Sequence, residues 1–366
     1  MTLTSRKTAL AGLAALGVSA LVLAGCSAAP TGGSTTKAAS NFLPCMVSDS
    51  GGFDDHSFNE LGKNGLDKAA KTLGVKSIAV ESKSDSDYAP NIESLLSQGC
   101  NLIVTVGFNL SAASLAAAKA NPDTKFAIID DAADANFDGQ VDEPNIKPIL
   151  FDTAQSAFMA GYAAASYTKT GKVATWGGMN FPTVTIFMDG FSQGVAYYNK
   201  QKSKSVAVLG YDPANPGAAT FTGGFEANDA AKTVAKNFID QGADVLLPVG
   251  GPIYQSAVAA IQDSAKDDVL VGVDADLFVT DPTTDALVLT SVEKGIESAT
   301  KNVIEDAAGG DFKNTAYIGT LKNDGVGIAP FHNFKSKVDS GLQNELDKIK
   351  ASIISGDLKV TSYLNK

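Results

Sequence analysis

Residues 91–107, NIESLLSQGCNLIVTVG, decide the fold class, because a helical segment runs directly into an apolar strand. The part NIESLLSQG is predicted to be a helix, and NLIVTVG is a short apolar run typical of a strand buried on both faces. A short helix followed at once by such a strand is typical of βαβ units. These units build parallel sheets with helices on both faces.

The same alternation continues on both sides of this stretch. Strands are predicted in CMVSD, SIAVES, NLIVTVG, KFAIIDD and KPILFD, and a second series follows in KVATWGG, SVAVLGYD, ADVLLPVGG, DVLVGVDAD and ALVLTSV. The tail holds one more helix, SGLQNELDKIKASIISG, and a last predicted strand, LKVTSYL. Roughly 325 residues follow the N-terminal segment, too many for one ordinary core. We therefore predict an α/β protein with two doubly wound parallel-sheet lobes.

The N-terminal segment has the features of an export signal. Arg6 and Lys7 precede an apolar run from Ala9 to Ala24 that is too short to span a bilayer comfortably. The run ends in LAGC, which resembles a bacterial lipobox, so residues 1–25 are predicted to be cleaved and Cys26 to be lipidated. Residues 26–40 then form a flexible tether. A plain signal peptide or a short membrane anchor is the alternative.

The other two cysteines open strands. Cys45 begins the first predicted strand and Cys100 precedes the third, and these strands are neighbours in a doubly wound sheet. A disulfide in an oxidising compartment and two buried thiols both fit this placement. His56 and His332 are the two histidines, and zinc spacings are absent from the sequence, so neither a metal site nor a Cys/His catalytic site is expected.

The charge of the chain argues against nucleic acid as a partner. The formal net charge is −11, and removal of Arg6 and Lys7 with the signal gives −11 − 2 = −13. An acidic surface repels phosphate backbones.

Polar clusters follow the strands of both series. They are SDSGGFDDHSFN, VGFNLS, IIDDAADAN, GGMNFPTVTIF, PVGG, VDAD and SVEK. Ligands of α/β sheets bind at the carboxyl ends of the strands. The clusters therefore predict one shared site between the two lobes.

Several of these motifs resemble the basic membrane protein family of lipoproteins. The resemblance covers roughly residues 42–366 and rests on the D–GG–DD–SFN opening, KFAIID, PNI…QSAFMAGYAAA…TGKVATWGGM, GFSQGV, VGVDAD and TSVEK. Members are substrate-binding proteins of ABC importers with a type I periplasmic-binding-protein fold, and they include a purine nucleoside receptor. The resemblance implies a purine nucleoside ligand, ABC permease and ATPase partners, no cofactor and no enzymatic activity.

The resemblance also implies which residues hold the base. Asp49 and Ser50 would address the base edge, and Phe58 would stack on the base. Phe187 would form the opposite aromatic wall, although a core position on a helix is the alternative.

A second set of implied residues would hold the ribose. Asp130 would meet the base or the ribose, with Asp131 as its rival. Gly250 would let the backbone approach the sugar, and Asp276 and Lys294 would bind its hydroxyl groups. A solvent-exposed lysine in the hinge is the alternative for Lys294.

Two nearby polar residues are expected to serve the backbone instead. Ser57 or Asn59 would cap the helix after the first loop, and we favour Asn59. Asp274 would structure its own turn.

The family fold further implies a hinge with three crossings, near residues 150, 293 and 327. Lobe 1 would comprise residues 41–150 and 293–326, and lobe 2 residues 151–292 and 327–366. We expect a monomer held by its lipid at the extracytoplasmic face of the cell membrane.

Three alternatives stay open. A free sugar or a signalling molecule could be the ligand of the same fold. A nucleoside hydrolase also opens with acids, near DxDxxxDD, but Ser48 and Ser50 stand here where two calcium ligands belong. Residues 134–145, DANFDGQVDEPN, approach a calcium loop, but the twelfth position is Asn145, and a solvated surface loop is favoured.

Overall fold

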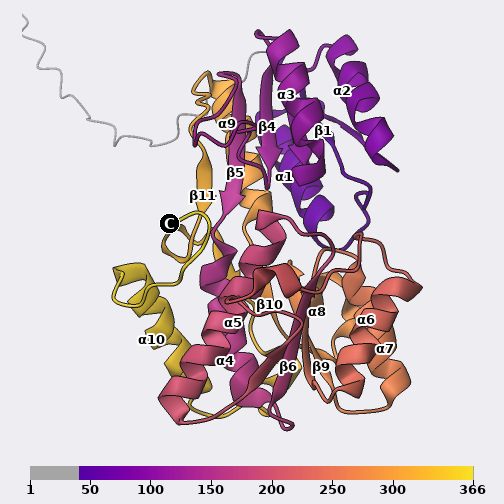
Figure 1. Cartoon of the computed structure of the whole chain (residues 1–366). Helices are drawn as coiled ribbons and strands as arrows, with labels where there is room; N and C mark the ends of the chain where they lie inside the picture. The colour runs from indigo at the N-terminus through magenta and orange to yellow at the C-terminus, as the bar shows by residue number, and fades with distance from the viewer. Residues whose placement is uncertain (1–40, 366) are drawn as a thin grey trace, which may run out of the picture. The chain divides into compact units, whose positions relative to one another are not determined.

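The computed structural model describes residues 41–365, and the predicted signal peptide, Cys26 and the tether lie outside them. Two six-stranded sheets form its framework (Figure 1). The first sheet has the order β11-β5-β4-β3-β1-β2, and all of its strand pairs are parallel. Its strands are β1 (Pro44–Val47), β2 (Ile78–Val80), β3 (Leu102–Val106), β4 (Lys125–Ile129), β5 (Ile146–Phe151) and β11 (Tyr317–Gly319).

The second sheet repeats this arrangement with one exception. Its order is β12-β10-β9-β8-β6-β7, and only the β10–β12 pair is antiparallel. Its strands are β6 (Lys172–Gly177), β7 (Ala207–Leu209), β8 (Val245–Val249), β9 (Val269–Asp274), β10 (Val288–Lys294) and β12 (Val326–Ile328). The predicted fold class, two doubly wound and mostly parallel sheets, is confirmed.

Helices cover both faces of the first sheet. α1 (Phe58–Leu73) packs with α9 (Ile296–Gly309), and α2 (Tyr88–Ser97) packs with α3 (Ser111–Ala120). Successive side chains of a strand point to opposite faces. Met46 accordingly joins the core under α1, whereas Cys45 joins the core under α2 and α3.

The helices of the second sheet are arranged in the same way. α4 (Thr153–Tyr167) and α5 (Pro182–Lys202) pack against each other, as do α6 (Asp229–Asp240) and α7 (Ile253–Ser264). α8 (Leu277–Thr280) is a single turn after β9, and α10 (Leu342–Ser355) packs on α4.

The chain passes between the sheets at three places that lie side by side. It crosses after β5, after β10 and between β11 and β12. The N–H of Asp152 donates to the carbonyl of Gly319 at 2.8 Å, and the N–H of Gly295 donates to that of Gly325 at 2.8 Å. The crossings lie beside the positions expected near residues 150, 293 and 327, whereas the exact lobe boundaries stay a prediction.

The predicted last strand, LKVTSYL, is wrong, because residues 358–364 form turns and extended chain outside both sheets. The Gln193 side chain of α5 binds the Thr361 backbone twice, donating to its carbonyl at 2.8 Å and accepting from its N–H at 2.9 Å. This side chain satisfies backbone groups that a neighbouring strand would otherwise bind.

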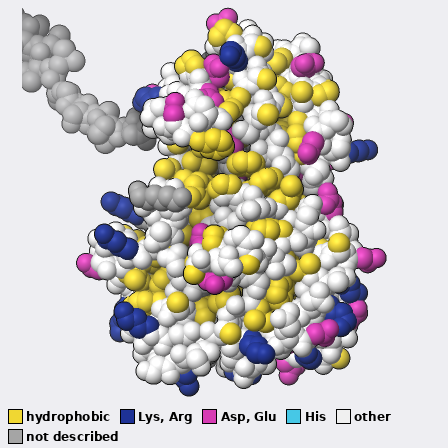
Figure 2. All heavy atoms as spheres, viewed as in Figure 1, with side chains coloured by type: hydrophobic (Ala, Val, Ile, Leu, Met, Phe, Trp, Pro, Cys, Tyr) yellow, Lys and Arg dark blue, Asp and Glu magenta, His cyan; other side chains and the backbone are white. Residues whose placement is uncertain are grey.

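Cys45 and Cys100 form a disulfide with a Cα–Cα distance of 6.0 Å. Of the two sequence-based alternatives, the structure thus has the bridge rather than two thiols. Within residues 41–365, no helix is both long enough and apolar enough to cross a membrane. On the face drawn in Figure 2, Lys and Arg side chains are scattered among Asp and Glu side chains.

Candidate functional site

A cavity lies at the carboxyl ends of strands from both sheets, where α/β sheets bind their ligands. The volume of the cavity itself, without its open mouth, is about 70 Å³. Its lining comes from the loops and ends predicted from the polar clusters. The lining residues are Asp49, Gly51, Asp55, Phe58, Asn59, Gly107, Phe108, Asn109, Asp130, Phe181, Thr183, Val184, Phe187, Phe225, Val249, Gly250, Gly251, Pro252, Asp274 and Lys294.

Lys294 lies at the centre of the charges that line the cavity. It ends β10, is 5% exposed, and forms an ion pair with Asp130 at the end of β4. A second carboxylate, Asp274 at the end of β9, places Oδ1 at 3.5 Å from Lys294 Nζ. Burial by itself would lower the pKa of Lys294, but the two carboxylates outweigh it and raise the pKa. The ammonium is therefore held charged.

The two carboxylates are themselves disfavoured by burial. The pKa of Asp274 is raised to about 6, mainly by burial and also by the charges of Asp130 and Asp55, against the lowering effect of Lys294. Burial also raises the pKa of Asp130, again against Lys294. Asp130 and Asp274 have φ of 63° and 68°, in the left-handed region that Asp tolerates better than most residues. Strained backbone of this kind clusters at functional sites.

Phenylalanine rings form the apolar part of the lining. Phe58 and Phe187 lie with ring centroids 5.2 Å and 5.0 Å from Lys294 Nζ. Phe108 and Phe181 stack on each other with centroids 4.5 Å apart, and Phe225 lies 6.1 Å from Phe181. The rings can bind a flat apolar surface beside the charges.

The loop after β1 is organised around Asp55 and Asn59. Asp55 accepts hydrogen bonds from the backbone N–H groups of Ser57, Asn59 and Glu60 at 2.8–3.0 Å, so it satisfies the first turn of α1. Asn59, favoured above as the cap, instead lines the cavity and donates from Nδ2 to Asp55 at 3.0 Å and to Asp49 at 2.8 Å. The favoured prediction, Asn59 as the cap, was therefore wrong: Ser57 occupies the N-cap position of α1, although its side chain makes no capping hydrogen bond.

Gly250 lines the cavity where β8 ends. A Cβ atom there would lie 2.7 Å from the Phe225 ring, and the φ of 147° is one that other residues rarely adopt. Glycine thus lets the Phe225 ring approach the backbone, whereas the contact with a sugar stays a prediction.

The structure brings six of the eight predicted ligand-binding residues into the lining, and it leaves Ser50 and Asp276 outside. The N–H of Gly51 donates to Asp49 Oδ1 at 2.8 Å, and this tight turn presents Gly51 rather than Ser50 to the cavity. Asp276 instead accepts from the N–H of Phe278 at 3.2 Å as the cap of α8, and it contacts His332 Nε2 at 2.7 Å.

The neighbouring acids exchange the expected roles. Asp274, expected to structure its own turn, lines the cavity, and the turn-forming role belongs to Asp276. Of the rivals Asp130 and Asp131, Asp130 lines the cavity, whereas Asp131 accepts from Ser111 Oγ at 2.8 Å and from the N–H of Ala133 at 2.7 Å.

Several lining residues were not singled out in the sequence. Phe108 and Asn109 belong to the cluster VGFNLS, and Phe181 belongs to GGMNFPTVTIF. Both clusters follow predicted strands, so their loops were already expected at the site because ligands bind at the carboxyl ends of strands. Phe225 stands in the loop before α6, for which no strand-end pattern was available.

The acidic loop at 134–145 folds on itself. Asp134 accepts from the N–H groups of Asp138 at 3.1 Å and of Gly139 at 2.8 Å, and Asp142 accepts from that of Ala135 at 2.8 Å. Among residues 41–365, no group of three or more His, Cys, Asp or Glu is arranged to hold a metal ion.

Two like lobes with a site at their facing strand ends define a substrate-binding protein of the type I periplasmic-binding fold. A solute-binding protein of an ABC transporter from Aeropyrum pernix has this fold, with a TM-score of 0.76 at 24% identity over 88% of this chain and 93% of that one. A solute-binding protein from Conexibacter woesei matches with a TM-score of 0.63 at 22% identity, over 87% of this chain and 99% of that one.

Sequence comparison then gives the family. Residues 42–362 match the Bmp family, described as PnrA-like ABC transporter substrate-binding proteins, and the chain belongs to it. The nucleoside-binding protein BmpA of a Lactococcus lactis ABC transporter is 29% identical over 94% of this chain and 96% of its own length. Basic membrane protein A of Borreliella burgdorferi is 28% identical over 85% of this chain and 86% of its own length. The resemblance inferred from the motifs is confirmed.

Proposed function

We propose that this protein is a lipid-anchored receptor that captures a purine nucleoside between its lobes for an ABC importer. The observation that carries the proposal is the combination of phenyl rings with the buried cluster of Asp130, Lys294 and Asp274. The rings can stack on a flat base. The two adjacent hydroxyl groups of ribose can donate hydrogen bonds to the carboxylates and accept one from the ammonium group between them. The Lactococcus lactis relative, whose name describes nucleoside binding, supports the same ligand class.

The free energy available from these groups is sufficient for tight capture. Stacking on an aromatic side chain contributes about 1–3 kcal/mol per base, and a hydrogen bond to a charged group about 1.5–3 kcal/mol. Two stacking partners and three or four such bonds reach roughly −10 to −12 kcal/mol after the costs of association, or nanomolar affinity.

Closure of the lobes is part of the proposed mechanism. Ser57 Oγ, before α1, donates to the carbonyl of Val273 in β9 at 3.1 Å, and the Asp130–Lys294 pair joins β4 to β10. These contacts join elements of the first sheet to elements of the second. Closure around a ligand excludes water and strengthens the charged hydrogen bonds. The permease would then bind the closed form of the protein, and the ATPase would drive transport.

A receptor fits this site better than a nucleoside hydrolase does. Ser48 and Ser50 replace two acids of the hydrolase calcium motif. The carboxylate of Asp55 is also occupied by the backbone of α1. No metal-activated water is therefore proposed in this site.

Titration calorimetry with inosine, guanosine and ribose tests the ligand class. We expect both nucleosides to bind at nanomolar to sub-micromolar concentration and ribose to bind at least 100-fold more weakly, because ribose lacks the stacked base. Ribose that bound as tightly as inosine would contradict the nucleoside proposal. Release of hypoxanthine during a long incubation with inosine would identify an enzyme instead.

A further inference from the structure

Ser57 is a buried serine that bonds to the second sheet rather than to its own helix. It stands at the N-cap position of α1, is 1% exposed, and makes no capping hydrogen bond with its side chain. Its Oγ instead donates to the carbonyl of Val273 at 3.1 Å and lies 3.4 Å from Asp274 Oδ2, both at the end of β9. Ser57 thus joins the loop after β1 to the second sheet without lining the cavity.

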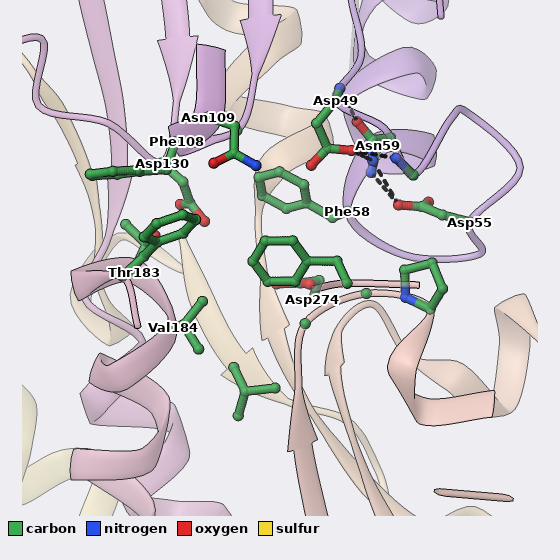
Figure 3. A pocket seen from close by; sticks show the side chains of 18 of the residues that line it. Asp49, Asp55, Phe58, Asn59, Phe108, Asn109, Asp130, Thr183, Val184 and Asp274 are labelled. Carbon is green, nitrogen blue, oxygen red and sulfur yellow. Dashed lines mark hydrogen bonds between the residues drawn. The ribbon is translucent and has the colours of Figure 1, made fainter. Parts of the chain in front are cut away.

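The carboxylate of Asp55 explains why the Ser57 hydroxyl is free to make this bond. A serine at an N-cap ordinarily accepts from the N–H of the second or third residue of its helix. In α1 these residues are Asn59 and Glu60, and Asp55 already accepts from their N–H groups at 2.8 Å and 3.0 Å. Figure 3 shows Asp55 bonded to Asn59 at the start of α1. The helix therefore does not need the Ser57 hydroxyl.

The backbone on both sides of this contact is in the left-handed region. His56, directly before Ser57, has a φ of 55°, and Asp274 has a φ of 68°. His and Asp adopt such angles more readily than most residues, yet the angles remain uncommon for any residue but glycine. Unfavourable backbone conformations of this kind cluster at functional sites. Two of them next to one interlobe bond indicate that the bond has a role beyond local packing.

The contact lies directly beside two groups that line the cavity. Phe58 follows Ser57 in the sequence, and its ring centroid lies 5.2 Å from Lys294 Nζ. Asp274, from the second sheet, places Oδ1 at 3.5 Å from the same nitrogen. Figure 3 shows Phe58 directed into the pocket with Asp274 below it. Separation of the lobes at this point therefore has to break the Ser57 bond.

We propose that Ser57 is a positioning residue that stabilises the closed conformation around the ligand, through its hydrogen bond to the end of β9. The bond contributes in the closed conformation and is lost when the lobes separate, so it shifts the equilibrium between open and closed forms. It should thereby slow the release of the ligand. This inference rests on the proposed function, because it concerns closure over the same site.

The variant Ser57→Ala removes the interlobe bond and leaves the neighbouring groups with partners. The Val273 carbonyl also accepts from the N–H of Ala275 at 2.8 Å, and Asp55 still satisfies the start of α1. We expect inosine to dissociate about 3–10-fold faster in stopped-flow measurements, the effect of one neutral hydrogen bond. Its affinity should fall by a similar factor in calorimetry.

Ser114→Ala is the matched control. Ser114 is also a fully buried serine near the start of a helix, but its Oγ bonds to Thr105 Oγ1 at 2.8 Å, between α3 and β3 of the first sheet. This variant loses a buried hydrogen bond as well, yet the bond does not join the lobes. Its dissociation rate and affinity for inosine should therefore equal those of the wild-type protein.

Hydrogen exchange of backbone amides separates a role in closure from a role in stability. With inosine bound, Ser57→Ala should exchange faster than the wild-type protein at the facing segments, residues 50–57 and 273–277, and at the wild-type rate in β3 and β8. Ser114→Ala should exchange faster around β3 and α3 and at the wild-type rate in the facing segments.

The outcomes distinguish this inference from the proposed function. An unchanged dissociation rate in Ser57→Ala would overturn the inference, and so would faster exchange spread evenly through the protein. If inosine does not bind the wild-type protein, the proposed function fails, and exchange without ligand then tests the interlobe bond. Faster exchange of Ser57→Ala at the facing segments would support the bond, and equal exchange there would overturn it.

Discussion

The buried carboxylate of Asp274 destabilises the folded protein but is suited to bind a ligand. It is 5% exposed, and its Oδ1 accepts no hydrogen bond from the described residues, with the Lys294 ammonium 3.5 Å away. A buried acceptor without a donor destabilises the folded chain. A ligand hydroxyl group that donates a hydrogen bond to this oxygen would remove that loss of stability. The filled site should therefore be more stable than the empty one.

The variant Asp274→Asn should therefore be more stable and bind more weakly. Burial raises the folded-state pKa from 3.8 to about 6, so the penalty for ionisation is absent below pH 3.8, grows as pH rises, and is complete above about 6. The variant should gain about 1–3 kcal/mol of unfolding free energy at pH 7.5 and much less at pH 4.5. Urea denaturation at both pH values measures this difference.

The control for this prediction is Asp276→Asn. Asp276 carries the same charge nearby but caps α8 outside the cavity. Inosine affinity should fall in Asp274→Asn and stay within about threefold in Asp276→Asn, since only the former loses a hydrogen bond from the ligand to a charged group. A stability gain that is equal at pH 4.5 and 7.5 would contradict the role of ionisation.

Among the helices, α4 and α5 pack with their backbones in contact. A Cβ atom added at Gly161 would lie 2.1 Å from the carbonyl oxygen of Phe191. A Cβ atom added at Gly190 would lie 2.3 Å from the carbonyl oxygen of Ala154, and one added at Gly194 would lie 2.0 Å from that of Phe158. Gly161 lies on α4 and the other two glycines lie on α5, and none of the three positions has room for a side chain. The sequence motifs QSAFMAGYAAA and GFSQGV contain these positions.

Gly194→Ala should separate the two helices. The added methyl group has no space, so we expect a loss of about 1–3 kcal/mol of unfolding free energy in urea titrations, typical of overpacking. Gly309→Ala is the control: Gly309 also lies in a helix, but a Cβ atom there meets nothing within 4 Å. That variant should be unchanged or more stable by about 0.4–1 kcal/mol. Equal losses in both variants would show that the seam is not tightly packed.

For the molecule as a whole, ligand binding and membrane anchoring belong to different parts of the chain. The cavity lies within residues 41–365, whereas the predicted anchor, Cys26, precedes them. A receptor for an importer works only near its permease, and a lipid anchor with a tether would keep it there. The extracytoplasmic location therefore belongs to the same proposal as the ligand.

Metabolic labelling with a fatty acid tests this anchor. The wild-type protein should incorporate labelled palmitate, and Cys26→Ala should not, because the acylated position is removed. Cys100→Ala is the control, since Cys100 is bonded to Cys45 and should not carry lipid. Label retained in Cys26→Ala would contradict lipidation at this residue.

Local sequence patterns were enough to define the two-sheet architecture, the family and most of the loops that line the cavity. Apolar runs and helical spacing are local properties, and the carboxyl ends of parallel strands meet at one edge whatever their order. The motifs around Asp49, Phe58 and Lys294 lie at such ends, so their position along the chain already indicated a shared binding site.

The choice between neighbouring side chains came from packing in three dimensions. Asp274 and Asp276 are two residues apart in VDAD, and the left-handed backbone at Asp274 together with the short helix after Asp276 turns one into the cavity and ties the other to His332. The prediction of a final strand was wrong for the same kind of reason, because the side chain of a distant residue, Gln193, forms the hydrogen bonds of the backbone at Thr361. Backbone angles at strand ends and partners distant in sequence arise from packing, which no local pattern displays.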